Sequence, residues 1–308
     1  MVNLSVELTS NSKYDLILPN PVLVASGTFS NALEMSKINN IELLGGIISK
    51  GTTINPRFGN NSPRIIETSS GLINSIGFQN IGVNAFIKDI LPIWNKWNVP
   101  SIVNIMGNNI QEYGELALKF DDISSIDALE INISCPNVEV GGMEFGQDPH
   151  EAIKVMKSVK KNTDKPCIVK LSPIVSNLQE IVKAVQEHGA DAITVSNTYP
   201  AMAIDINKRK PILGAKFGGL SGPAVKSMTI RNVYIASKVA TIPIIASGGI
   251  MSAEDAIEAM MAGASAVQIG TATYIDPDAP WKIINGITEW CETNTINDIN
   301  EIIGSAVI

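Results

Sequence analysis

A cysteine stands between a β-branched run and a proline in the stretch LEINISCPNVEVGGMEFG, residues 129–146. Asn132 precedes Cys135 by three positions, and Gly141 and Gly142 allow the following segment to bend. A thiol at the end of a strand could serve in packing, metal binding, a disulfide, nucleophilic attack or proton transfer. The chain has only 3 cysteines, widely spaced, and 2 histidines. These counts favour neither a disulfide framework nor a zinc or imidazole site, so we expect no bound metal.

Polar residues and glycines end the apolar runs along the chain. They are Ser26, Lys50, Asn104, Asn132 with Cys135, Lys170, Ser196 with Asn197, Gly248 with Gly249, and Gly270 with Thr271. Each buried polar group must find a hydrogen-bond partner. A ring of amides and ammonium groups therefore predicts a binding site for a planar ligand rich in acceptors.

The last two runs are followed by glycines, in the motifs SGGIMSAED and IGTATY. Bare backbone N–H groups beside the start of a helix bind phosphate well, which predicts a phosphate-bearing ligand. Lys50 and Lys170 would then face a ring that becomes negative during the reaction. A reduced flavin is such a ring, since a fixed ammonium stabilises the charge on its nitrogen-1 and oxygen-2 edge.

Eight short apolar runs, most of them followed by a helix-like stretch, would position these residues. They are VLVAS (22–26), GIISK (46–50), SIVNI (101–105), LEINIS (129–134), CIVKLS (167–172), AITVSN (192–197), PIIASGG (243–249) and AVQIGT (266–271). Continuous apolar strands separated by helices are typical of a parallel sheet buried on both faces, and eight close an α/β (β/α)8 TIM barrel. The alternative is a doubly wound open sheet. It would normally carry a glycine-rich fingerprint after its first strand, where this chain has SGTFSNALEM.

Two segments are too long for plain connections, residues 51–100 and 198–242. In a barrel such excursions lie at the C-terminal face, where active sites are built. Residues 4–22 are typical of a hairpin, which we expect to plug the bottom of the barrel. The helix in SAEDAIEAMMAG should begin after Ser252 as N-cap and end at Gly263. With no linker in the sequence, we interpret residues 1–308 as one domain.

Composition excludes several classes of protein. With 308 residues and 45% hydrophobic content the chain can bury one large core. The net charge of −7 argues against a nucleic-acid binder or a binder of anionic membranes. Neither a signal peptide nor a spanning helix is evident, so we expect a soluble cytoplasmic protein.

The order and spacing of several motifs resemble those of dihydroorotate dehydrogenases, most closely the type 1B catalytic subunit. The motifs are SGTF, KGTT followed by PRFGN, NSIGFQN, NISCPNVEVGG, VKLSP, SNT, GGLSGPA, ASGGI and MAGASAVQIGTA. The last two are common to many barrels, whereas NISCPNV together with KGTT and NSIGFQN is specific. The resemblance covers nearly the whole chain. It implies a flavin mononucleotide (FMN) enzyme that oxidises dihydroorotate to orotate in pyrimidine (UMP) biosynthesis.

The resemblance also implies roles for individual residues. Those implied to bind FMN are Ser26, Lys50, Gly51, Asn104, Asn132, Lys170, Ser196, Gly222, Gly248, Gly249, Gly270 and Thr271. Those implied to bind substrate are Lys50, Asn74, Ser75, Ile76, Gly77, Phe78, Asn132, Asn197 and Thr198. Asparagine offers both a donor and an acceptor to the edges of orotate. Cys135 is then the expected base, because a thiol of pKa ~8.5 accepts a proton without being fully ionised at rest. Cys167 and Cys291 are expected to be structural.

The electron acceptor implied by the type 1B resemblance is NAD. The chain has neither a dinucleotide fold nor four thiolates for an iron–sulfur cluster, so electrons would leave through a second subunit carrying FAD and [2Fe-2S]. The expected assembly is a catalytic homodimer in a heterotetramer with that subunit. Quinone-using relatives carry a serine in place of the cysteine. Other interpretations stay open. They are a type 1A-like homodimer using fumarate, an FMN barrel reductase of another dihydropyrimidine that runs as the reduction of a uracil-type ring, and a non-redox phosphate-binding lyase or isomerase.

Overall fold

Parallel strands form a closed barrel in the computed structural model, which describes residues 2–9, 13–134 and 145–308. The strands are β3 (Val22–Val24), β4 (Ile47–Ile48), β7 (Ser101–Ile105), β8 (Ala128–Asn132), β9 (Cys167–Lys170), β10 (Ala192–Val195), β15 (Ile244–Ser247) and β16 (Ala266–Ile269). Their order is β3-β16-β15-β10-β9-β8-β7-β4, and every ladder in this 8-stranded sheet is parallel. The predicted TIM barrel is therefore confirmed.

The two ends of this order, β3 and β4, meet and close the barrel. Gly45 N donates to Val22 O at 2.8 Å, and Leu23 and Gly46 form a parallel bridge. A Cβ at Gly45 would lie 2.1 Å from Asn20 O, so only glycine permits this approach. The closure makes the open doubly wound alternative wrong.

Helices follow most of the strands and cover the outside of the barrel. They are α1 (Gly82–Ala85), the π-helical η3 (Phe86–Ile90), α2 (Leu91–Trp94), α3 (Ile110–Asp121), α4 (Pro149–Lys160), α5 (Leu178–Gln186), α6 (Lys226–Ser237), α7 (Ala253–Met261), α8 (Ala272–Ile275) and α9 (Ala279–Thr293). Short 3-10 turns occur at η1 (Met35–Lys37), η2 (Ile41–Leu43), η5 (Phe145–Gln147), η6 (Pro223–Val225) and η7 (Ile299–Ile302). Ser252 caps α7 in a capping box with Asp255, as predicted, and Gly263 follows the helix end with φ of +117°. Between β3 and β4 the described chain forms the 3-10 turns η1 and η2 instead of an α-helix. Helix α9 packs against this side of the barrel, where Trp281 Nε1 donates to Asn40 O.

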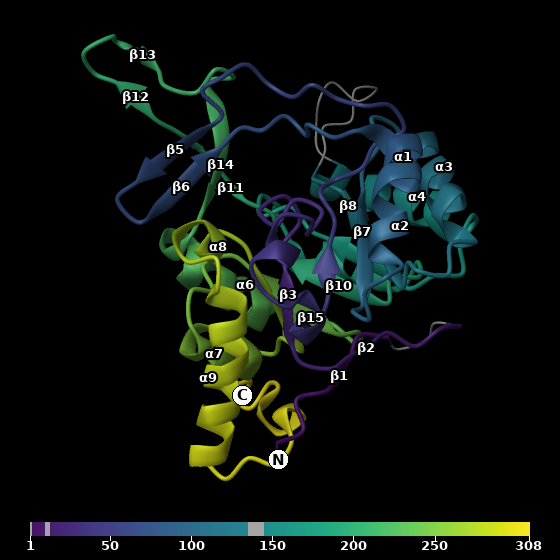
Figure 1. The fold of residues 1–308 in the computed structure, drawn as a ribbon, viewed down its shortest axis with the longest axis vertical. Coiled ribbons are helices and arrows are strands. Elements are labelled where there is room, and N and C mark those ends of the chain that lie inside the picture. The colour runs from purple at the N-terminus through teal and green to yellow at the C-terminus, as the bar shows by residue number, and fades with distance from the viewer. Residues whose placement is uncertain (1, 10–12, 135–144) are drawn as a thin grey trace.

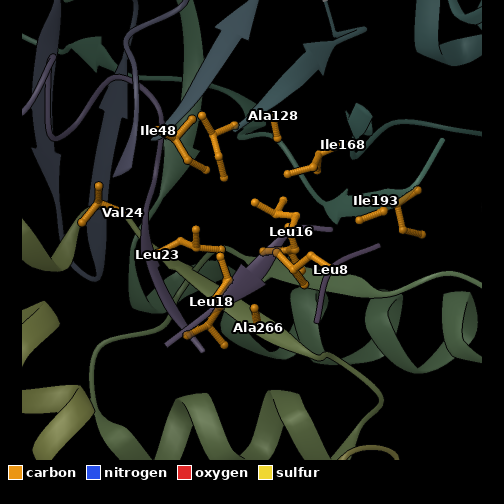
Figure 2. Close-up of a cluster of buried hydrophobic side chains, with 14 of the residues drawn as sticks. Leu8, Leu16, Leu18, Leu23, Val24, Ile48, Ala128, Ile168, Ile193 and Ala266 are labelled. Carbon is orange, nitrogen blue, oxygen red and sulfur yellow. The ribbon is translucent and has the colours of Figure 1, made fainter. Parts of the chain in front are cut away.

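The N-terminal hairpin closes the bottom of the barrel, as predicted. Strand β1 (Val6–Glu7) pairs antiparallel with β2 (Ile17–Leu18). Leu8, Leu16 and Leu18 point among side chains from the beginnings of the barrel strands (Figure 2). All three leucines are buried, so the hairpin packs apolar side chains against this end of the barrel.

The two long excursions meet at the opposite end. Strands β5 (Ile65–Thr68) and β6 (Gly71–Asn74) pair with β11 (Tyr199–Met202) and β14 (Phe217–Ser221) in a 4-stranded antiparallel sheet of order β11-β14-β6-β5. Figure 1 shows this sheet, with the small hairpin β12 (Ile204–Asp205) and β13 (Lys210–Pro211), far from the N-terminus. The excursions also contain barrel helices, α1 to α2 and α6. No helix in the described part of the chain is both long enough and apolar enough to cross a membrane.

Candidate active site

A cavity of about 780 Å³ opens at the carboxyl ends of the barrel strands, beneath the antiparallel sheet. Every described residue that the sequence analysis placed at a cofactor or substrate site lines it. At or directly after the strand ends these are Ser26, Lys50, Gly51, Asn104, Asn132, Lys170, Ser196, Asn197, Thr198, Gly248, Gly249, Gly270 and Thr271. From farther along the excursions they are Asn74, Ser75, Ile76, Gly77, Phe78 and Gly222. Cys135, Gly141 and Gly142 lie outside the described residues, although Ser134 lines the cavity.

The asparagines converge on one part of the cavity. Asn197 Nδ2 donates to Asn132 Oδ1 at 3.3 Å, which joins the ends of β10 and β8. Asn74 Nδ2 donates to Gly219 O at 3.2 Å, because Asn74 and Gly219 are register partners of β6 and β14. A Cβ at Gly219 would lie 1.9 Å from Thr198 Oγ1, so a glycine is required for Thr198 to pack there. The excursions therefore complete a site that the barrel strands begin.

Two lysines supply positive charge at different depths. Lys170 is buried, and its Nζ donates to Gln268 Oε1 at 3.0 Å and to Ser26 Oγ at 3.4 Å. Lys50 is half-buried, and its pKa is lowered first by that burial and second by the charge of Arg64. An ammonium that is partly desolvated in this way gains from an anionic ligand, which makes Lys50 suited to a carboxylate or an electron-rich ring.

Glycines shape the end of the cavity that follows β15 and β16. Gly248 has φ of +129° and Gly249 of +76°, both in the region that side chains disfavour. A Cβ at Gly249 would lie 2.5 Å from the backbone N and Cα of Lys226, the first residue of α6. Thr271 Oγ1 donates to Ser221 Oγ at 2.8 Å. Backbone thus approaches backbone here beside the starts of two helices, an arrangement suited to a phosphate group.

A polar cluster below the cavity was missed by the sequence analysis. Glu130 of β8 is 0% exposed and accepts from Asn104 Nδ2 at 2.6 Å, Gln268 Nε2 at 2.5 Å and Thr194 Oγ1 at 3.0 Å. Lys170 Nζ lies 3.7 Å from its Oε1. The available signal was a charged residue inside a continuous apolar run, which almost never occurs unless the charge is paired.

Arg64 was also missed. It lines the cavity and fixes the excursion: Nη1 donates to Gln79 Oε1 at 2.7 Å and Nη2 to Phe58 O at 2.9 Å. It stands one residue before β5, in a stretch of irregular local pattern, so no periodicity marked it. The two described cysteines, Cys167 and Cys291, are buried, and burial raises the pKa of Cys167 to about 12, which suits structural thiols.

Comparison with known proteins identifies relatives along nearly the whole chain. A family model described as "Dihydroorotate dehydrogenase" matches residues 9–290. A protein of Geotalea uraniireducens is 47% identical over 305 residues, covering 99% of this chain and 98% of its own length. One of Desulforamulus reducens is 49% identical over 305 residues, covering 99% of each chain. One of Geobacter sulfurreducens is 46% identical over 303 residues, covering 98% of each. All three are named dihydroorotate dehydrogenase B (NAD(+)), catalytic subunit.

Proposed function

This chain belongs to the dihydroorotate dehydrogenase family, and we propose on that premise that it oxidises dihydroorotate to orotate in pyrimidine biosynthesis as the catalytic subunit of an NAD-linked enzyme. The observation that carries the proposal is that Asn74, Asn132 and Asn197 line one cavity together with two lysines and a set of glycines. That combination fits a flat substrate beside a phosphate-bearing flavin.

The residues present fit FMN. Among the described residues, Asn104 Oδ1 is buried without a hydrogen-bond partner, although Asn104 lines the cavity. An orphaned buried acceptor costs stability, which a ligand donor relieves. We infer that the turns at Gly248–Gly249 and Gly270–Thr271 hold the phosphate, while Lys170, Asn104 and Ser26 face the ring. When bound there, FMN supplies the acceptor for a hydride.

The chain's own residues would bind and orient the substrate. The amides of Asn74, Asn132 and Asn197 offer donors and acceptors to the imide and carbonyl edges of the dihydroorotate ring. Lys50 supplies positive charge, and the Ser75–Phe78 segment with Thr198 closes the wall of the cavity. Orientation matters because hydride transfer requires carbon 6 to be held close to its acceptor.

Proton removal from carbon 5 requires a base, and we propose Cys135 for this role. The support is that Ser134, the residue before it in the sequence, lines the cavity. Cys135 would take the proton from carbon 5, and FMN, when held by the residues of the cavity, would supply the acceptor for the hydride of carbon 6. Asn132 and Asn197, joined to each other, hold the ring during both transfers.

Electrons would pass to NAD through a second subunit carrying FAD and [2Fe-2S], bound to a homodimer of this chain. The support is the printed name of the relatives, in which "catalytic subunit" implies a further subunit.

The test is an anaerobic absorbance titration of the purified, FMN-loaded chain with dihydroorotate, followed by fumarate or NAD. Bleaching of the flavin band that neither acceptor reverses supports the proposal. Reoxidation by fumarate alone would indicate a self-sufficient homodimer, reoxidation by NAD alone would remove the need for a partner, and absence of bleaching would overturn the substrate.

A further inference from the structure

Glu130 is the one acidic residue among the described residues of the polar cluster below the cavity. Glu130 and Asn132 are two positions apart in β8, so they face the same side of the strand and lie at successive depths inside the barrel. Asn132 lines the cavity, whereas Glu130 is 0% exposed and lies beneath it. Its position therefore permits an influence on a ligand only through the side chains it contacts.

A carboxylate has acceptors only, and this decides how the neighbouring amides turn. Asn104 and Gln268 both direct their NH2 groups at Glu130, at 2.6 and 2.5 Å. Their carbonyl oxygens consequently point away from it. Gln268 Oε1 accepts from Lys170 Nζ at 3.0 Å, and Asn104 Oδ1 is left without a partner among the described residues.

We propose that Glu130 is a positioning residue that makes Asn104 present an acceptor, rather than a donor, to a ring N–H of the bound flavin. The inference rests on the proposed FMN site. The oxidised flavin ring carries one N–H group, so the orientation of a facing amide decides between a hydrogen bond and a clash of two donors. Glu130 also offsets the charge of Lys170, 3.7 Å away, and so moderates how strongly that ammonium stabilises negative charge on the ring.

The replacement Glu130→Gln keeps the size of the side chain and puts an NH2 group in place of one oxygen. One neighbouring amide must then turn to accept from it. Gln268 is held by Lys170, because an ammonium has only donors and needs the Oε1 acceptor. Asn104 therefore turns and directs its own NH2 at the cavity.

The experiment titrates the full-length apoprotein with FMN and follows quenching of flavin fluorescence. Wild type should bind, and Glu130→Gln should raise the Kd for FMN roughly 10- to 100-fold, as expected when a buried hydrogen bond becomes a clash. The midpoint potential of the bound flavin, measured by reductive titration, should shift to a more positive value, because a negative charge beside Lys170 has been removed.

A double variant tests the orientation itself. In Glu130→Gln with Asn104→Asp, the carboxylate at position 104 accepts from the new amide and still turns an oxygen toward the cavity. We expect the Kd and the potential to return toward wild type. The matched control is Thr194→Val, which removes another hydrogen bond to Glu130 without touching Asn104. It should lower the thermal midpoint of the apoprotein while leaving the Kd for FMN unchanged.

Each outcome separates this inference from the proposed function. Failure of wild type to bind FMN would overturn the function itself. Wild-type Kd and potential in Glu130→Gln, or a double variant no better than the single one, would overturn only the role of Glu130. If Glu130→Gln does not fold, Asn104→Leu removes the same outward oxygen, and an unchanged Kd in that variant also overturns the proposal.

Discussion

The two ends of the barrel are built from the same strands, but the side chains buried at the bottom are apolar and several of those buried at the top are polar. At the bottom, Leu8, Leu16 and Leu18 of the hairpin pack against apolar residues where the strands begin (Figure 2). At the top, Lys170 and Asn104 are buried just as deeply but are bonded to other polar groups. Parallel strands bring all their starts to one end and all their carboxyl termini to the other. The packing at the bottom stabilises the barrel, and the polar groups at the top line the cavity in which we propose that the ligands bind.

The largest expected effect breaks the chemistry at the top and leaves the bottom untouched. Cys135→Ala should retain FMN but slow flavin reduction by dihydroorotate about 10²- to 10⁴-fold, because the proton on carbon 5 loses its base. Anaerobic stopped-flow absorbance measures this rate. The matched control is Cys167→Ala, a buried cysteine within β9, which should lower stability and leave the reduction rate intact. Equal rates in wild type and Cys135→Ala would remove Cys135 from the mechanism.

A substitution at the bottom should lower stability and leave ligand binding at the top unchanged. Leu18→Ala removes a fully buried side chain from the plug and should lower the free energy of unfolding by about 2–5 kcal/mol. Urea unfolding of the apoprotein measures the loss. The Kd for FMN, measured on the folded variant without urea, should equal that of wild type. A higher Kd in Leu18→Ala would show that the two ends are coupled.

Two glycines at the top distinguish backbone packing from ligand binding. Gly249→Ala forces a Cβ against the backbone of Lys226 at positive φ, and should cost about 1–3 kcal/mol of apoprotein stability as well as FMN affinity. Gly270→Ala meets nothing closer than 3.5 Å and should leave the apoprotein's unfolding unchanged. The comparison is made by thermal unfolding of both apoproteins. Equal losses in the two variants would contradict the packing argument.

The smallest effect compares one lysine from each end. Burial lowers the pKa of Lys50 below 10.5, so between that lowered value and 10.5 the unfolded chain binds more protons than the folded one. Stability then rises with pH across this window. Lys50→Met should therefore be slightly more stable than wild type at pH 7, and urea unfolding should show that gap narrowing as pH approaches 10.5. A stability difference between Lys50→Met and wild type that does not change with pH would contradict the lowered pKa of Lys50.

Lys165, at the start of β9, is the control for that measurement. Burial also lowers its pKa, but its Nζ donates to Ile123 O at 3.0 Å and Ile126 O at 2.7 Å. Lys165→Met leaves both carbonyls without this donor and should destabilise the protein at pH 7. If Lys50→Met raises stability at pH 7 and Lys165→Met lowers it, the lysine at the bottom is fully hydrogen-bonded within the protein and the lysine at the top is not.

Much of the barrel was predictable because its strands are buried on both faces and are therefore apolar without a break. SIVNI matches β7 residue for residue, whereas GIISK contains only the two-residue β4. An ideal (β/α)8 barrel has a helix after each strand, but 3-10 turns follow β3, since α9 covers that side from the other end of the chain. The pairing of Gly219 with Asn74 had no local signal, because the two residues are 145 positions apart in the sequence.

The sequence by itself determined the strands, the polar residues that end them, and the family to which those motifs point, because these depend on side-chain type and local spacing. The roles of Cys135 and of the individual binding residues stay predictions. Tertiary structure alone decided that the excursions complete the cavity, that Gly219 and Gly249 must lack side chains, and that Asn104 donates to Glu130. These properties depend on contacts between residues that are far apart in the sequence, and local periodicity carries no information about such contacts.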